Sequence, residues 1–307
     1  MKACIDIGGT KVAVSLNSGN DLKLLARQSE PTVTTGTSDA LGRQVIRLVD
    51  AACAELGVEP SSVQRAGVSS CGPFVMRDGL IEVAAPNICG GLAGPDRGLP
   101  NDWKTAPVEA PLRSRFREVR VENDGIAALE AERRWGALQG IDHCAYVTWS
   151  TGVGTGLCVD GRILRGKSGN AGHAGHMFVS DNDDALCGCG NIGDVEALVA
   201  GNAIERRFGT DSQLLMQQAE AGDPQALARV DDLCRVMGRT LYNMIVTLDL
   251  QCISLGGGVF WHHHRFLLPR LTQQIRGKLG PLTDGCELVA AGLEDRVGDY
   301  AALALLV

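Results

Sequence analysis

Short apolar segments alternate with amphipathic helical segments along this chain, and glycine-rich turns follow several of the apolar segments. Residues 3–7 and 10–16 flank Gly8-Gly9, a pattern that predicts a β-hairpin with glycine at both centre positions of its turn. Apolar positions then recur at helical spacing over residues 38–56. Strands that alternate with helices predict an α/β fold class.

The pattern restarts in the second half of the chain. Residues 144–149 form a predicted strand, residues 151–156 a glycine-rich turn, and residues 157–160 a second strand. A strand–turn–strand unit in each half of the chain suggests two related domains. Farther on, Asp223-Pro224 has the residue types of a helix start, and the helix predicted after it has one apolar face up to residue 248.

Length and composition agree with a globular protein of two domains. The chain has 307 residues, more than one hydrophobic core usually fills. It has 45% hydrophobic and 21% charged residues, and its net charge of −7 argues against nucleic acid or an anionic membrane as the main partner. The chain has no apolar run of membrane-spanning length, and its first residues lack the apolar core of a signal peptide. We therefore expect a cytoplasmic protein.

The eleven cysteines are mostly scattered singly through apolar segments. In a reducing compartment such cysteines are small buried hydrophobic residues. Cys187 and Cys189 are different, because they are close together and follow His176. Their residue types and spacing are compatible with zinc.

Two glycine turns have the composition of a phosphate-binding loop. Glycine lets backbone N–H groups approach a phosphate, and a hydroxyl or a lysine completes the cradle. One turn alone is equally well explained as a hairpin turn, whereas two turns together with a third glycine cluster favour a nucleotide site. The residues concerned are Asp6, Gly8, Gly9, Thr10 and Lys11 in the first turn, Thr151, Gly152 and Gly154 in the second, and Gly256, Gly257 and Gly258 in the third. No Walker A sequence is present.

Asn123-Asp124 follows a short apolar strand and opens a helix that we expect to end near Gly136. Asparagine and aspartate are preferred residues at helix N-termini, so one interpretation is a helix cap. The other interpretation is a polar site at the end of a strand.

Together, the two glycine turns, Asn123-Asp124 and the stretch from Gly172 to Glu196 resemble the ROK family of sugar kinases and sugar-responsive repressors, over nearly the whole chain. The resemblance implies two α/β domains of the ribonuclease-H-like, actin-like ATPase fold, with the active site in the cleft between them. The expected small domain comprises residues 1–121 and 298–307, and the expected large domain comprises residues 122–297.

The resemblance also implies roles for the site residues. Asp124 is the expected catalytic base, and the first two glycine turns are expected to hold the phosphates of ATP, which brings Mg²⁺. The third glycine cluster, with Gly298-Asp299, is expected to contact adenosine. The expected sugar ligands are Asn87, Asn123, His173, His176 and Glu196. A homodimer that binds a small-molecule sugar and ATP is implied, without a nucleic-acid or membrane partner.

The family pattern places a further cysteine five residues after Cys189, where this chain has Asp194. Zinc accepts a carboxylate oxygen, so His176, Cys187, Cys189 and Asp194 are expected to form a structural zinc site that braces the sugar-binding loop. The alternative is a decayed site in which the two cysteines belong to an ordinary turn.

A second departure concerns His173, because many kinases of the family have glutamate at this position. A neutral imidazole offers one donor and one acceptor, whereas the carboxylate offers acceptors only. The pattern looks like that of some N-acetylmannosamine kinases, although His173 could equally pack away from the sugar. Glucose, N-acetylmannosamine and N-acetylglucosamine all remain open as substrates, with plain glucokinase slightly disfavoured.

A repressor and a catalytically silent sugar-binding protein are the alternatives to a kinase. Repressors of the family carry a helix-turn-helix domain before the first glycine turn, which here begins at residue 6 and leaves no room for one. A catalytically silent sugar-binding protein is disfavoured by the intact phosphate turns and Asp124, and favoured by the changes at His173 and Asp194. His262-His263-His264 is expected to be a solvated face and not a metal site, because adjacent side chains point in different directions.

Overall fold

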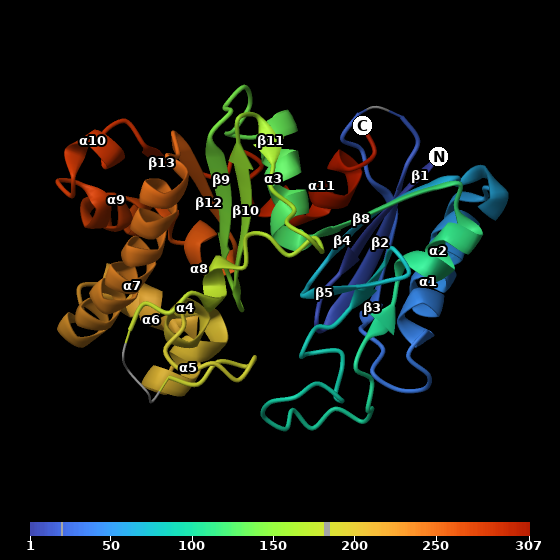
Figure 1. The fold of residues 1–307 in the computed structure, drawn as a ribbon, viewed down its shortest axis with the longest axis horizontal. Coiled ribbons are helices and arrows are strands. Elements are labelled where there is room, and N and C mark those ends of the chain that lie inside the picture. The colour runs from blue at the N-terminus through green and yellow to red at the C-terminus, as the bar shows by residue number, and fades with distance from the viewer. Residues whose placement is uncertain (20, 181–184) are drawn as a thin grey trace. The chain divides into compact units, whose positions relative to one another are not determined.

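The computed structural model describes residues 1–19, 21–180 and 185–307, which form two compact units (Figure 1). The first unit contains residues 1–131, 165–171 and 298–307, and the second contains residues 132–164 and 172–297. The division expected from the sequence placed residues 122–131 and 165–171 with the second unit. Both segments belong to the first unit instead. Residues 122–131 contain the end of β8 and the start of α3 (Asp124–Trp135). Residues 165–171 hydrogen-bond to residues of the first unit, through Arg165 to Glu122 and through Asn170 to Phe74.

The first unit contains a mixed five-stranded sheet and a smaller three-stranded antiparallel sheet. The order of the large sheet is β3 (Leu25–Pro31), β2 (Lys11–Asn17), β1 (Lys2–Ile7), β4 (Arg65–Ser70) and β8 (Glu118–Asn123). The small sheet contains β5 (Phe74–Arg77), β6 (Leu80–Val83) and β7 (Ala106–Pro107), and the remaining helical segments of this unit are α1 (Ala40–Leu56), η1 (Pro60–Ser62), α2 (Glu109–Arg115) and α11 (Val297–Ala304).

The second unit repeats the topology of the first sheet. Its order is β11 (Arg162–Ile163), β10 (Val153–Val159), β9 (Cys144–Trp149), β12 (Cys252–Gly256) and β13 (Glu287–Ala290). In both sheets a central strand pairs with an antiparallel neighbour on one side and a parallel neighbour on the other. The two strand–turn–strand units in the sequence therefore correspond to equivalent halves of two similar sheets.

Helices of the second unit lie between these strands in the chain. They are η2 (Ala174–His176), α4 (Val195–Val199), α5 (Gly201–Phe208), α6 (Ser212–Glu220), α7 (Pro224–Leu248), α8 (Gly258–Trp261), α9 (His264–Ile275), α10 (Gly280–Thr283) and η3 (Glu294–Arg296). The predicted helix start at Asp223 is confirmed, because its side chain accepts a hydrogen bond from the N–H of Ala226 at 2.8 Å. Among the described residues, no helix has the length and apolar character that a bilayer span requires.

Each unit has its own hydrophobic core. In the first, α1 packs on one face of the large sheet, and Leu41, Val45 and Leu48 are buried against strand residues such as Ile5 (Figure 1). In the second, the apolar face of α7 packs with α9 and the sheet. The five cysteines at positions 4, 53, 144, 158 and 252 are buried, as expected, and no disulfide joins any cysteines of the described residues.

The histidine triplet is not a solvated face, so that prediction is wrong. His263 is buried and its Nδ1 lies 3.0 Å from Glu220 Oε1. His264 Nδ1 lies 2.7 Å from the carbonyl oxygen of Trp261, whose ring stacks on its imidazole. His262 is the exposed member of the triplet. The start of α9 turns successive side chains in different directions, so each histidine has a different environment.

Candidate active site

The parallel strands of the first unit bring three distant segments to one edge of the sheet. Ile7 of β1 pairs with Ser70 of β4, and Ser70 pairs with Asn123 of β8. The Cys71 N–H extends this alignment by donating to the carbonyl oxygen of Ile7 at 2.8 Å. The first glycine turn, Cys71 and Asp124 therefore follow directly after neighbouring strand ends, where ligand sites of α/β proteins form.

Asn123 and Asp124 both contact the first turn of α3. Asn123 is buried, and its Oδ1 accepts a hydrogen bond from the N–H of Gly125 at 3.0 Å. Asp124 is exposed, and its Oδ1 accepts from the same N–H at 2.8 Å. The capping interpretation is thus confirmed. Capping does not exclude a catalytic role, because the side chain of Asp124 is exposed to solvent.

Asp6 lies in a group of charged side chains at this edge. Burial of Asp6, followed by the neighbouring Asp124 carboxylate, raises its pKa to about 7, even though Lys11 and Arg27 act in the opposite direction. A carboxyl group with this pKa exchanges its proton near neutral pH. Such groups are frequent at functional sites.

The first glycine turn differs from the predicted one. The Gly8 N–H donates to the Lys11 carbonyl oxygen at 2.8 Å, so Gly9 and Thr10 are the centre residues. The backbone of neither glycine is left-handed. Gly9 is required for another reason: a Cβ there would lie 2.8 Å from Cβ of Asn87. The turn therefore brings the predicted sugar ligand Asn87 against the predicted phosphate cradle.

Replacing Gly9 with alanine is expected to lower kcat/KM for sugar phosphorylation about tenfold or more, because the new methyl group displaces the turn or Asn87. Steady-state kinetics with ATP and the preferred sugar would measure this loss. Gly19→Ala is the matched control, since the atom nearest to its added Cβ is Asp21 Oδ1 at an ordinary 3.7 Å. Equal kinetics for both variants would contradict the expectation.

The second glycine turn is shorter than predicted. Trp149 of β9 pairs with Val153 of β10, and the Ser150 N–H donates to the Gly152 carbonyl oxygen at 2.9 Å. Gly154 is therefore a strand residue and not a turn residue, which corrects the predicted turn over 151–156. The antiparallel ladder extends to the turn because small residues in β10 do not obstruct it.

The third glycine cluster, Gly256–Gly258, follows β12 and lies beside the end of β9. Gly257 has a φ of 88°, and a Cβ there would lie 2.5 Å from the Trp149 carbonyl oxygen. Only glycine suits both the left-handed backbone and this close approach. Gly257 thus lies against Trp149, the strand residue that precedes the second glycine turn in the same unit. Gly298 and Asp299, in contrast, lie in the first unit, where Asp299 pairs with Arg27.

Glu196 of α4 connects the second turn to the cysteine loop. Its Oε2 accepts a hydrogen bond from the Val153 N–H at 3.0 Å, and its Oε1 accepts from the Cys187 thiol at 3.7 Å. A Cβ at Gly152 would lie 2.6 Å from Oε2, so glycine gives this carboxylate its room.

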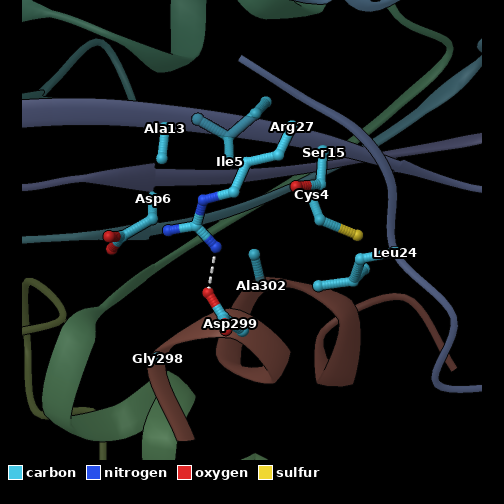
Figure 2. Close-up of a pocket in the computed structure, with 10 residues that line it drawn as sticks. All are labelled: Cys4, Ile5, Asp6, Ala13, Ser15, Leu24, Arg27, Gly298, Asp299 and Ala302. Atoms are coloured by element: carbon cyan, nitrogen blue, oxygen red, sulfur yellow. Dashed lines mark hydrogen bonds and ion pairs between the residues drawn. The ribbon is translucent and has the colours of Figure 1, made fainter. Parts of the chain in front are cut away.

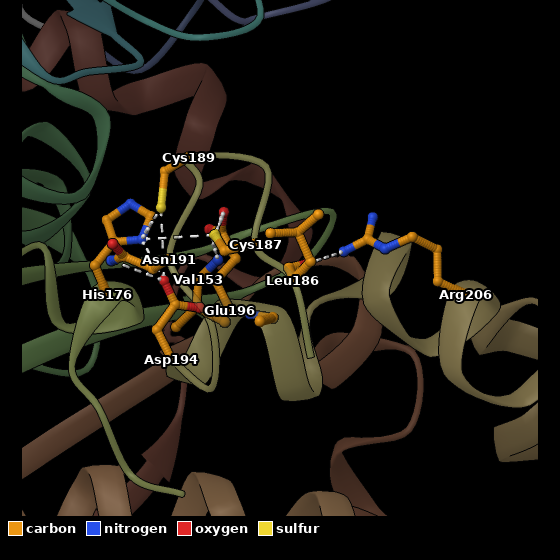
Figure 3. Close-up of polar contacts among 10 residues, drawn as sticks. Val153, His176, Leu186, Cys187, Cys189, Asn191, Asp194, Glu196 and Arg206 are labelled. Carbon is orange, nitrogen blue, oxygen red and sulfur yellow. Dashed lines mark hydrogen bonds and ion pairs between the residues drawn. The ribbon is translucent and has the colours of Figure 1, made fainter. Parts of the chain in front are cut away.

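The four predicted zinc ligands converge in the second unit (Figure 3). Their ligand atoms all lie within 4.8 Å of one another. His176 Nδ1 is 3.1 Å from Asp194 Oδ2, 3.6 Å from Cys189 Sγ and 3.9 Å from Cys187 Sγ. Zinc bonds of about 2.0–2.3 Å in a tetrahedron separate neighbouring ligands by roughly 3.3–3.8 Å. The donor set and its spacing therefore fit tetrahedral zinc.

Asp194 performs two tasks that a cysteine could not combine. It is fully buried, and its Oδ1 caps α4 by accepting a hydrogen bond from the Ala197 N–H at 2.8 Å. Its Oδ2 faces the other three ligands and accepts from Asn191 Nδ2 at 3.3 Å. The carboxylate thus caps a helix with one oxygen and completes the ligand cluster with the other.

His173 precedes η2 and lies beside the ligand cluster. Its ring stacks near that of His176, with 6.0 Å between the centroids. Burial, together with the neighbouring His176, lowers the pKa of His173, which favours the neutral imidazole. Its Nε2 is buried and has no hydrogen-bond partner among the described residues.

Sequence patterns did not indicate Asn170, which fixes the segment leading to His173. Its Oδ1 accepts from the Phe74 N–H at 2.7 Å, and its Nδ2 donates to the Phe74 carbonyl oxygen at 2.8 Å. One amide thereby satisfies both backbone groups at the start of β5, an edge strand. Asn170 stands in a glycine-rich stretch without periodicity, so no local signal distinguishes it.

Comparison with known proteins gives consistent matches over the chain. The ROK family model matches residues 2–307. An N-acetylmannosamine kinase from Salmonella paratyphi B is 32% identical, over 83% of this chain and 82% of its own length. Crystal structures with the same fold are those of the ROK hexokinase from Thermus thermophilus and of a ROK family glucokinase from Streptomyces griseus in complex with glucose and AMPPNP.

The hexokinase is 30% identical, with a TM-score of 0.75, over 99% of this chain and 97% of its own. The glucokinase is 25% identical, with a TM-score of 0.72, over 98% of this chain and 97% of its own. A ROK family transcriptional regulator, 20% identical with a TM-score of 0.77 over 99% of this chain and 76% of its own, shares the fold.

Proposed function

Because this chain belongs to the ROK family and is a sugar kinase, we propose that it transfers the γ-phosphoryl group of ATP to the primary hydroxyl of a hexose or an N-acetylhexosamine. The fold is that of the ribonuclease-H-like, actin-like ATPases. The glucokinase of Streptomyces griseus was solved with glucose and an ATP analogue, which supports a sugar and a nucleotide as ligands here.

The observation that carries this proposal is the alignment of Asp124, after β8, with the first glycine turn, after β1, at one edge of the sheet on either side of β4. An exposed carboxylate at this place can accept the proton of a sugar hydroxyl. Its position at a helix N-terminus favours the anion and makes it a weak base. Phosphoryl transfer tolerates a weak base, because the transition state is loose and the base chiefly orients the attacking oxygen.

Nucleotide binding is assigned to the glycine turns. Backbone N–H groups at Gly9 and Thr10 and at Thr151–Gly152, with the Lys11 ammonium, are suited to phosphate oxygens. Gly256–Gly258 are assigned to the adenosine, and Mg²⁺ arrives with ATP to neutralise phosphate charge.

Zinc is proposed as a structural ion held by His176, Cys187, Cys189 and Asp194, because their donor atoms fit its preferred geometry. Four protein ligands leave no position for water, so the ion would supply folding free energy and no catalytic chemistry. The ligand Asp194 caps α4, which carries Glu196, and the ligand His176 lies beside His173; Glu196 and His173 are both assigned to the sugar. The metal would therefore hold the sugar ligands in place.

We propose that His173 contributes to recognition of the acceptor sugar. Its buried Nε2 lacks a protein partner within the described residues, and an unpaired buried nitrogen is stabilised by a substrate hydroxyl or amide. Asn87, Asn123, His176 and Glu196 supply the remaining polar groups of the proposed sugar site. Groups built for particular hydroxyls reject sugars that lack them.

His173→Glu is expected to shift the preference towards glucose, with the kcat/KM ratio of glucose to N-acetylmannosamine rising about tenfold or more. The carboxylate adds acceptors that the neutral imidazole lacks. Paired kinetics with the two sugars would measure the ratio. An unchanged ratio in a folded variant would show that His173 does not set the specificity.

The proposed activity is tested by sugar-dependent ADP release from MgATP. The sugars are glucose, mannose, fructose, allose, N-acetylglucosamine and N-acetylmannosamine. Turnover with one of them would establish the reaction and the acceptor together. Sugar binding without any turnover would instead support the catalytically silent sugar-binding protein.

A further inference from the structure

A small pocket in the first unit is lined by residues of β1 and β2, the two strands that the predicted phosphate turn connects (Figure 2). Asp6 and Cys4 of β1 and their pairing partners Ala13 and Ser15 of β2 form its floor, because paired residues share one face of a sheet. The first residues of α11 form the opposite wall. Arg27 of β3 reaches across this space towards Asp299 (Figure 2).

A β-bulge directs Arg27 into the pocket. The register of β2 and β3 shifts between Val14 and Leu16, so that Ala26 and Arg27 together face Ser15. Ala26 has a φ of 48°, in the left-handed region that alanine disfavours. Bulges of this kind redirect a side chain next to active sites, and strained residues are frequent there.

Stability does not account for this arrangement. Arg27 forms an ion pair with Asp299, but the two side chains are 49% and 32% exposed. Ion pairs at such exposure are screened by solvent and contribute little to folding. The left-handed Ala26 is itself destabilising, so the bulge calls for another explanation.

The charged groups around Asp6 supply an explanation for the position of Arg27. Asp124 at the start of α3 and Asp299 on α11 disfavour its charged form, whereas Lys11 on β2 and Arg27 on β3 favour it. The Cys71 thiol beyond β4 also faces the two carboxylates Asp6 and Asp124. Asp6 is therefore an acidic group between two other carboxylates, with two cations to offset them. Lys11 belongs to the proposed phosphate cradle, which leaves Arg27 as the cation that lines the same pocket as Asp6 and lies outside that cradle.

We propose that Arg27, held in place by Asp299, is a positioning residue that keeps the Asp6 carboxylate charged and oriented beside the phosphate-binding turn. This inference rests on the proposed kinase function. Arg27 does not need to touch the nucleotide, because it acts through Asp6. The bulge, with the strained Ala26, then places the Arg27 guanidinium in the pocket that Asp6 lines.

The test is the pH profile of kcat/KM for MgATP in Arg27→Met, with the sugar preferred by the wild type. Loss of the guanidinium is expected to move the acid limb to a pH higher by about 0.5–1, since less positive charge stabilises the Asp6 carboxylate. At pH 7 the variant would then be about two- to fivefold slower, because the charged fraction of Asp6 falls by that factor, and Arg27→Lys would restore most of the loss. A purely structural role for the pair would leave the profile unmoved.

Arg47→Met is the matched control, because Arg47 pairs with Glu30 on the surface of the same unit at similar exposure. Its pH profile is expected to match that of the wild type. Asp299→Asn provides the second variant: the amide oxygen can still accept the hydrogen bond of Arg27, while one negative charge near Asp6 is removed, so the acid limb of its profile should move to lower pH. Unchanged profiles in folded Arg27→Met and Asp299→Asn would overturn the inference.

Failure of the kinase proposal would look different. A wild type without turnover on any sugar would reject the proposed function, and Arg27 would then be judged by binding of MgADP. Weaker binding in Arg27→Met that Arg27→Lys restores would still support the positioning role. Equal affinities for all three proteins would overturn it.

Discussion

Asp124→Asn is expected to reduce sugar-dependent ADP release by about 10²–10⁴-fold, the usual contribution of a positioned general base. The amide keeps the size of the side chain and can still accept the hydrogen bond that Asp124 Oδ1 receives from Gly125. The fold and the cap of α3 should therefore survive, while the group that takes the hydroxyl proton is lost. Coupled-enzyme kinetics at saturating sugar and ATP would measure the change in kcat.

The control for this prediction is an aspartate outside the site. Asp231 lies on α7, and its side chain is 64% exposed beside Arg270. Asp231→Asn should retain wild-type kinetics. Binding of the sugar to Asp124→Asn, measured by calorimetry, should persist within a few-fold, since the exposed carboxylate is only one of several polar contacts. Full activity of Asp124→Asn would show that another group is the base.

Removal of the proposed zinc should produce the largest effect on stability. The purified protein is expected to contain one zinc ion per chain, and Cys189→Ala is expected to contain almost none. An ion present at about a thousand times its Kd stabilises a fold by about 4 kcal/mol, so the melting temperature should fall by roughly 10 °C. Elemental analysis and thermal unfolding would measure the two quantities.

Cys286→Ala is the matched control, because Cys286 is a partly buried cysteine of the same unit outside the ligand cluster. Its zinc content should equal that of the wild type. Asp194→Asn should lose both the ion and part of the α4 cap strength, whereas Asp194→Cys should retain zinc and lose only the capping bond to Ala197. Equal zinc content in wild type and Cys189→Ala would contradict the assignment.

The secondary-structure elements that local patterns predicted are present. The helix predicted over residues 38–56 spans residues 40–56, and the capped start at Asp223 and both strand–turn–strand units are found. The errors have local causes. Gly154 belongs to a strand because the ladder partner Thr148 draws it into the sheet, although glycine is typical of turns. His263 is buried because tertiary packing places Glu220 beside it.

The residues of the candidate site were predicted from their types, but their geometry could not be predicted from the sequence. The ligand types His, Cys, Cys and Asp indicated zinc, but only the fold shows that Asp194 divides its two oxygens between a helix cap and the ligand cluster. No sequence pattern indicated the role of Glu132. This buried carboxylate accepts hydrogen bonds from the backbone N–H groups of Gly292 and Leu293, which are distant in the sequence.

The sequence by itself determined the alternation of strands and helices, the glycine turns and the chemical types of the site residues, because periodicity and residue chemistry are local properties. The tertiary structure alone decided that Asp6, Cys71 and Asp124 share one sheet edge and that Arg27 reaches Asp299. Strand register and a bulge set these proximities. Both depend on which distant segments pair, and no local pattern encodes that choice.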